Sequence, residues 1–122
     1  ANEAKARGGE RKLILACLLH DASEAYIADI IRPVKPYLTN YLEIEDQIMS
    51  VIWQHFQLEL TPEEHKKWKQ IDDEILDSEL KEMFSGEAER IPVPLRSTPD
   101  FSERPHGEVE EEFIRIAEEL LN

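Results

Sequence analysis

The chain has 122 residues, a length that suits one domain. Its 14 lysine and arginine residues face 27 aspartate and glutamate residues, and the resulting net charge of −13 argues against nucleic acids and anionic membrane surfaces as general partners. A single cysteine, Cys17, excludes a disulfide within the chain, and the longest apolar run, residues 13–19, is too short to span a bilayer. With no signal peptide visible, we expect a cytoplasmic protein.

The charge is unevenly distributed along the sequence. Residues 1–40 carry six basic and five acidic side chains, whereas residues 41–122 carry eight basic and 22 acidic ones. Such asymmetry can mark a region that handles anions on an otherwise acidic body. On charge alone, however, a solvated acidic surface is the more common explanation.

The first third of the chain predicts short helices separated by breaks. Residues 2–7 form the end of a helix that Gly8 terminates, and residues 10–20 form a helix that is apolar nearly all round. We therefore expect this second helix to be central and buried. Residues 22–28 continue helically or after a kink, and the prolines within residues 32–36 predict a loop.

The rest of the chain predicts three longer helices. Apolar residues at three- and four-residue spacing indicate a helix over residues 40–56. A capping box from Thr61 to Glu64, with Pro62 at the first helical position, indicates another over residues 61–84. Residues 85–106 contain four prolines and predict a long irregular segment, which in a small domain is often functional or mobile. A last helix covers residues 108–121. The sequence thus predicts an all-α protein, a compact helical bundle.

Two adjacent side chains that commonly bind metals, His20 and Asp21, directly follow the most apolar helix. Glu24 lies four residues after His20, so the three side chains approach one face if the helix continues. The alternative is that His20 packs and Asp21 caps the next turn. Taken alone, the dipeptide favours this plainer interpretation.

The helix over residues 61–84 places two carboxylates on its apolar face. At roughly 100° per residue, Asp72 lies about 40° and Glu79 about 20° from Trp68, which marks the centre of that face. Three neighbouring carboxylates are expected to point to solvent: Asp73, Glu74 and Asp77. A buried carboxylate needs a cationic partner, hydrogen bonds or a metal ion. Asp72 therefore either pairs with a buried arginine or lysine or meets His20 and Asp21 around a divalent cation.

A set of one histidine and two aspartates mixes nitrogen and oxygen ligands. Such a set suits Mn, Co, Fe, Zn or Mg, and the sequence does not choose among them. A divalent ion held there would supply hydroxide near neutral pH and neutralise a phosphoryl group.

The segment of residues 18–35, LLHDASEAYIADIIRPVK, resembles the HD motif and the block that follows it in the HD-domain metal-dependent phosphohydrolases, in particular their 5′-deoxynucleotidase-like branch. The helix bearing Asp72 is similar to the one that carries the last aspartate of that family. The resemblance implies a single HD-type domain over residues 1–122. It covers residues 1 to 84 well and the last third of the chain weakly.

The resemblance also implies roles for individual residues. His20, Asp21 and Asp72 would hold the metal, and Glu24 would act beside it in proton transfer or in orienting the attacking water. Three residues would contact a nucleoside monophosphate: Asp29 at the sugar hydroxyl, and Arg32 and Lys35 at the phosphate or a neighbouring loop. The family has one further histidine ligand. No histidine precedes His20 here, so we expect the domain to be incomplete at its N-terminus.

The expected function is therefore metal-dependent hydrolysis of a phosphate monoester of a nucleotide-like substrate. One alternative is an HD-fold module that binds nucleotides or regulates a partner without catalysis. Another is a helical interaction domain that uses its acidic C-terminal surface for docking. Relatives in the family often form dimers, and the sequence leaves a homodimer open. Tyr26, Trp68 and Cys17 are expected in the core, Tyr26 and Trp68 in preference to stacking on a base.

Overall fold

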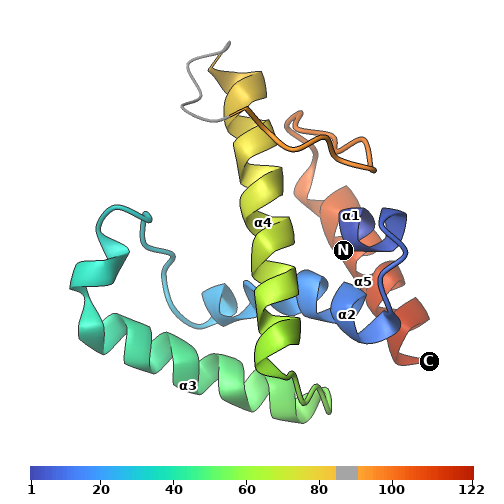
Figure 1. Cartoon of the computed structure of the whole chain (residues 1–122). Coiled ribbons are helices and arrows are strands. Elements are labelled where there is room, and N and C mark those ends of the chain that lie inside the picture. Colours follow the sequence, from blue (N-terminus) through green and yellow to red (C-terminus); the bar gives the residue numbers. More distant parts are fainter. Residues whose placement is uncertain (85–90) are drawn as a thin grey trace. The chain divides into compact units, whose positions relative to one another are not determined.

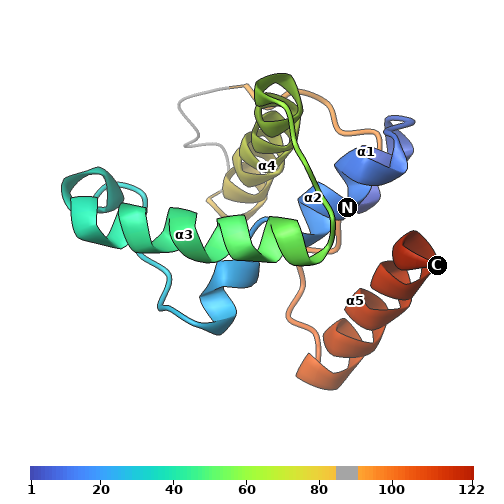
Figure 2. The same ribbon diagram turned by 90° about the horizontal axis from the view of Figure 1, so that it is seen from below.

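In the computed structural model, which describes residues 1–84 and 91–122, all regular structure is helical (Figures 1 and 2). This confirms the predicted all-α class. The described part of the chain contains five α-helices and two short 3₁₀ turns: α1 (Asn2–Ala6), α2 (Arg11–Leu19), η1 (Ala22–Ala25), η2 (Lys35–Tyr37), α3 (Thr39–His55), α4 (Pro62–Met83) and α5 (His106–Leu121). None of these helices combines the length and the apolar character needed to cross a membrane.

The chain divides into two compact units. The first unit consists of residues 1–18 and 61–122, and the second unit consists of residues 19–60. The first unit therefore contains α1, most of α2, α4 and α5, and the second contains η1, η2 and α3.

Glycine ends the first helix, as predicted. Gly8 has a positive φ of 74°, a conformation that costs little only for a residue without a side chain. Gly9 donates its backbone N–H to the carbonyl oxygen of Ala4 at 2.8 Å, and a Cβ atom at Gly9 would lie only 2.8 Å from that same oxygen. The Gly8–Gly9 turn thus brings the chain from α1 into α2 by a path that other residues would strain.

Local signals also set the start of α4. The Glu64 N–H donates to Thr61 Oγ1 at 3.3 Å, and the Thr61 N–H donates to Glu64 Oε2 at 2.7 Å. These two bonds form the predicted capping box, and Pro62 occupies the first helical position. Lys12 of α2 adds an ion pair to the same Glu64 carboxylate, with 2.9 Å between Lys12 Nζ and Glu64 Oε2.

The core of the first unit joins four helices. Buried Ala4, Ile14, Cys17 and Ile71 form its centre, and partly buried side chains pack around it: Ala1, Leu13, Trp68, Ile75 and Leu120. Cys17 and Trp68 therefore occupy the core positions expected for them, and burial raises the pKa of the Cys17 thiol. The helix that is apolar nearly all round, α2, supplies five of the nine buried apolar residues in the described part of the chain, as its sequence predicted.

In the second unit, α3 packs against both 3₁₀ turns. Met49 of α3 and Leu58 are buried, whereas Tyr26 is 74% exposed. The expected core position of Tyr26 is therefore wrong. The α-helix ends at Leu19, and the 3₁₀ turn η1 is wound more tightly than an α-helix. Tyr26, which follows η1, therefore does not continue the buried face of α2.

The predicted irregular segment is confirmed for residues 91–105, which contain no helix or strand. The part of that prediction that concerns residues 85–90 lies outside the described residues. The last helix begins at His106, two residues earlier than expected.

Candidate functional site

His20 and Asp21 lie in the turn that directly follows α2. His20 is half-buried and Asp21 is exposed, and 3.0 Å separates His20 Nε2 from Asp21 Oδ2. Because α2 ends at Leu19, Glu24 does not share a helical face with these residues; it belongs to the 3₁₀ turn η1. The structure thus brings the predicted pair of metal ligands together. It places Glu24 in a 3₁₀ turn and not in a continuation of the α-helix.

Glu24 is an exposed residue on which two other carboxylates of the second unit act. Partial desolvation of its carboxyl group raises its pKa, and the negative charges of Asp21 and Asp29 raise it further. Lys35 and His20 act in the opposite direction. Five predicted site residues therefore share one electrostatic neighbourhood in the second unit, and its acidic members repel each other.

Lys35 makes contacts that the sequence did not predict. Its ammonium group pairs with Glu45 Oε2 of α3 at 2.9 Å and lies 5.6 Å from the centre of the Tyr41 ring. Tyr41 donates its hydroxyl to the carbonyl oxygen of Ala28 at 2.8 Å. Partial burial and the adjacent Glu45 raise the pKa of Tyr41 to about 12.

Tyr41 and Glu45 were not predicted as contacts of Lys35, because nothing in the sequence pattern links them to the predicted loop of residues 32–36. They are four residues apart, a spacing that places both on one side of α3. That spacing alone could have suggested a common partner, but not Lys35. A phosphate approaching Lys35 would compete with Glu45 for its charge. The other two predicted substrate contacts, Asp29 and Arg32, are exposed.

Asp72, the third predicted metal ligand, belongs to α4 in the first unit. It is half-buried whereas Asp73 is exposed, and its charge acts on the buried Cys17 thiol. This agrees with the predicted orientation of the two side chains on α4. Because His20 and Asp21 belong to the second unit, the three-ligand set stays a prediction. Within the ranges 1–84 and 91–122, no three histidine, cysteine, aspartate or glutamate side chains are grouped to hold a metal ion.

Glu74 does not point to solvent, contrary to the sequence expectation. Its side chain is mostly buried, and 2.5 Å separates its Oε2 from Arg7 Nη1. Arg7 also donates from Nε to Glu3 Oε1 at 2.6 Å. The prediction failed because α1 packs against α4 and covers this flank of the helix, which the periodicity of α4 alone does not reveal.

Glu3 is a carboxylate with several hydrogen-bond donors, and its sequence context gave little sign of this. It is 1% exposed and accepts the Arg96 N–H at 2.9 Å, the Ser97 N–H at 2.7 Å and the Ser97 hydroxyl. Although burial acts in the other direction, these donors and Arg7 lower its pKa to about 2. Glu3 therefore anchors residues 96–97 to α1.

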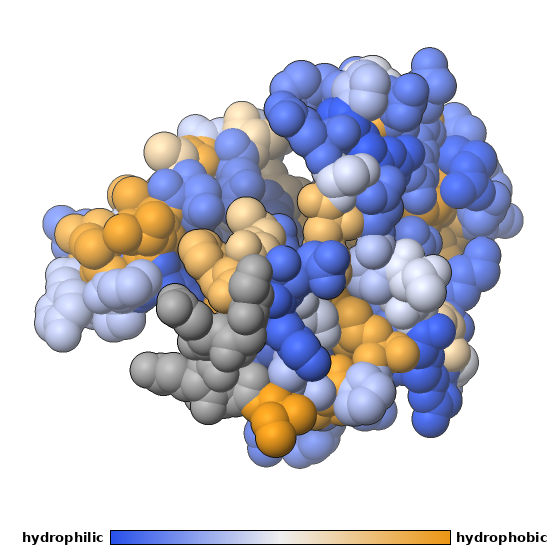
Figure 3. All heavy atoms as spheres, turned by 90° about the horizontal axis from the view of Figure 1, so that it is seen from above, coloured by the Kyte–Doolittle hydropathy of each residue, from blue (hydrophilic) through white to orange (hydrophobic). Residues whose placement is uncertain are grey.

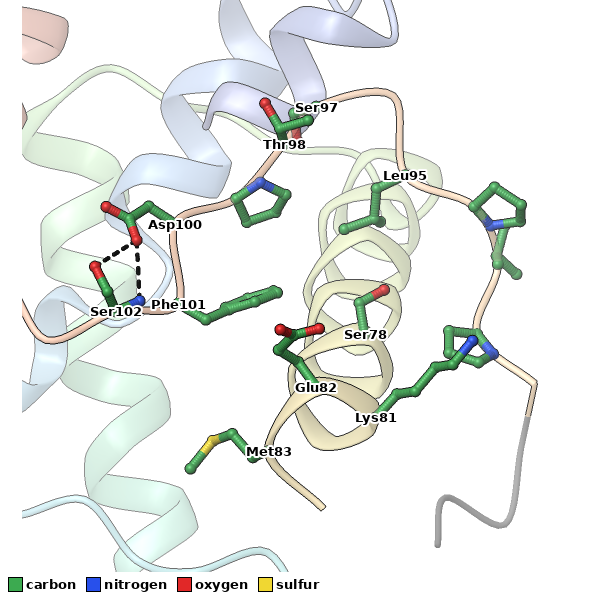
Figure 4. Close-up of a pocket in the computed structure, with 14 residues that line it drawn as sticks. Ser78, Lys81, Glu82, Met83, Leu95, Ser97, Thr98, Asp100, Phe101 and Ser102 are labelled. Carbon is green, nitrogen blue, oxygen red and sulfur yellow. Dashed lines mark hydrogen bonds between the residues drawn. The ribbon is translucent and has the colours of Figure 1, made fainter. Parts of the chain in front are cut away.

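A groove of about 1040 Å³ lies between the C-terminal end of α4 and the irregular segment that Glu3 anchors. Phe101 and Leu95 extend from that segment toward α4, whereas Asp100 accepts two hydrogen bonds from Ser102 at the rim (Figure 4). On the face drawn in Figure 3, hydrophobic residues reach the surface in separate places among hydrophilic ones. The groove carries cationic, acidic and apolar groups together, which does not select one class of ligand.

Comparison with known proteins yields no relative. No protein-family model, no curated protein and no solved structure matches the chain.

Proposed function

We propose that the chain is an HD-type, metal-dependent phosphohydrolase that cleaves a phosphate monoester of a nucleotide-like substrate. The observation that carries this proposal is the pairing of His20 and Asp21 at the end of the buried helix α2, next to Glu24 and Asp29. The resemblance of residues 18–35 to the HD block supports it. The proposal thus rests on one short segment and on the donor chemistry of the second unit.

The donor set fits a divalent ion. Two ligands that bind a metal at about 2.1 Å from neighbouring corners of an octahedron lie about 3.0 Å apart. His20 Nε2 and Asp21 Oδ2 are separated by 3.0 Å. The carboxylates around Glu24 concentrate negative charge, which a cation would offset. We propose Asp72 as the third ligand, with Mn, Co, Fe, Zn or Mg as the ion.

When bound, such an ion would lower the pKa of a coordinated water and neutralise charge on the phosphoryl group. Glu24 would accept a proton from the attacking water, a role to which a carboxylate with a raised pKa is suited. Asp29 would accept a hydrogen bond from a sugar hydroxyl. Arg32 and Lys35 would bind the phosphate, with Lys35 exchanging Glu45 for the substrate.

Metal binding by the whole chain tests the proposal. We expect Mn²⁺ or Co²⁺ to bind with about one ion per chain in isothermal titration calorimetry. His20→Ala and Asp21→Ala should each weaken that binding by about 100-fold or more, because the loss of an orienting neighbour alone costs 10–100-fold. His55→Ala changes an exposed histidine of the same unit and should leave binding unchanged. Release of phosphate from nucleoside monophosphates is measured in parallel.

Two further variants test the third ligand. Asp72→Ala should weaken metal binding, whereas Asp73→Ala, one residue away on the exposed side of α4, should not. The opposite result would refute the assignment of Asp72. Metal or nucleotide binding without turnover would indicate a binding module in place of an enzyme. Absence of both metal binding and phosphate release would overturn the proposal.

A further inference from the structure

The apolar stripe of α5 is covered over only part of its length. Val109, Phe113, Ile116 and Leu120 recur at spacings of three and four residues and share one side of the helix. Leu120 packs against the core of the first unit, and Ile116 is half-buried. By contrast, Val109 is 48% and Phe113 is 41% exposed.

The exposed part of the stripe is flanked by acidic residues. The sixteen residues of α5 contain one arginine and six glutamates: Glu108, Glu110, Glu111, Glu112, Glu118 and Glu119. Glu112 pairs with Arg104 and Glu119 with Arg115 and Lys5. The last turn contains no basic residue, so its glutamates lie beside the negative end of the helix dipole. A cationic partner would be attracted to this helix along its whole length.

The negative charge of the chain favours one kind of binding partner for the exposed part of the stripe over the others. A second copy would bring another chain of net charge −13, and the same six glutamates, against this helix. An anionic membrane surface would be repelled in the same way. An amphipathic helix with lysine or arginine beside its apolar face would match both the exposed side chains and the glutamates.

We propose that Val109 and Phe113, with the flanking glutamates of α5, form a docking surface for a basic amphipathic helix of a partner protein. The apolar contact would supply affinity, and the glutamates would supply attraction and orientation. This surface lies in the first unit and does not depend on the metal chemistry proposed for His20 and Asp21.

A labelled peptide tests the surface directly. The probe is a fluorescent 18-residue helix of leucine and lysine with one apolar face, titrated with the whole chain and followed by fluorescence anisotropy. The double variant V109S/F113S should weaken binding at least about tenfold, because two apolar contacts are lost. The variant E108Q/E110Q removes one exposed charge from each flank of the stripe; it should weaken binding about threefold at low salt and reduce its salt dependence.

Matched controls separate this surface from general attraction to an acidic protein. Val51→Ser removes a 65% exposed apolar side chain from α3 and should leave the affinity unchanged. A peptide of the same composition in scrambled order should bind at least about tenfold more weakly, since it presents no apolar face. Circular dichroism checks that each variant remains folded.

Three results would overturn the proposal. One is an affinity for the labelled peptide that is the same in V109S/F113S as in the wild type. Another is a dimer of the chain in sedimentation experiments that V109S/F113S abolishes, which would assign the surface to a second copy. The third is tighter binding to zwitterionic lipid vesicles than to the peptide, which would assign it to a membrane.

Discussion

Acidic residues in the two units have different surroundings, and their pKa values shift in opposite directions. In the first unit, Glu3, Glu64 and Glu74 each contact a cation or several donors, and the pKa of each is lowered. In the second unit, Glu24 lies among Asp21 and Asp29, and its pKa is raised. Lys35, whose charge lowers the pKa of Glu24, also pairs with Glu45.

This difference separates carboxylates that are held by donors from one that lies among like charges. A carboxylate held by donors stabilises the fold at neutral pH, whereas one placed among like charges destabilises it. Concentrated, poorly balanced charge is common at sites that bind cations or move protons. The raised pKa of Glu24 is one of the observations behind the site proposed above.

Removal of the Glu3 carboxylate is expected to have the largest effect on stability. Glu3→Ala should lower the free energy of unfolding by about 3 kcal/mol, because Arg7 then loses a buried partner and residues 96–97 lose their acceptor. Urea denaturation measures the change. The control Glu10→Ala, at an exposed position of the same unit, should change it by less than about 0.5 kcal/mol.

The pH dependence of unfolding follows from the same carboxylate. Since folding lowers the pKa of Glu3 from 4.5 to about 2, its contribution to stability is complete above 4.5 and is lost as the pH falls toward 2. Glu3→Gln should flatten the stability profile in that range. Equal stability of the wild type and both Glu3 variants would show that the donors around Glu3 stabilise nothing.

A smaller effect is expected at the capping box of α4. Thr61→Ala removes the hydroxyl that accepts the Glu64 N–H and should destabilise the chain by about 1 kcal/mol in thermal unfolding. Thr61→Ser retains the hydroxyl and should remain within a few tenths of a kcal/mol of the wild type. A loss shared by both variants would point to the methyl group of Thr61 rather than to its cap.

The smallest effect is expected in the second unit, at Glu24. Asp29→Asn should lower the pKa of Glu24, because one of the charges that raise it is removed. As the raised pKa costs stability once the pH exceeds it, the variant should also be slightly more stable at neutral pH. Carbon NMR titration of the Glu24 carboxyl measures the shift. Asp46→Asn, an exposed change in α3, serves as the control, and an identical Glu24 titration in both variants would contradict the clustered charge.

The sequence determined the helices themselves, because the forces that start and end them act over a few residues. The Gly8 stop, the Thr61–Glu64 cap and the apolar run of α2 were all predicted and are all present. The adjacency of His20 and Asp21 follows from the chain alone. The local geometry of Glu24 did not follow from the chain alone, because the sequence left open whether residues 22–28 continue the helix or follow a kink.

Tertiary structure decided which charged side chains meet. Glu3 contacts Ser97 across 94 positions of sequence, and Glu74 contacts Arg7 because α1 covers one flank of α4. Lys35 likewise meets Glu45 and Tyr41 through the packing of α3. Periodicity fixes the direction of a side chain relative to its own helix, but the burial and charge of its partners depend on which other element packs there. For this reason the sequence indicated its helices and an HD-like motif, whereas the division between stabilised and repelling carboxylates emerged only from the folded chain.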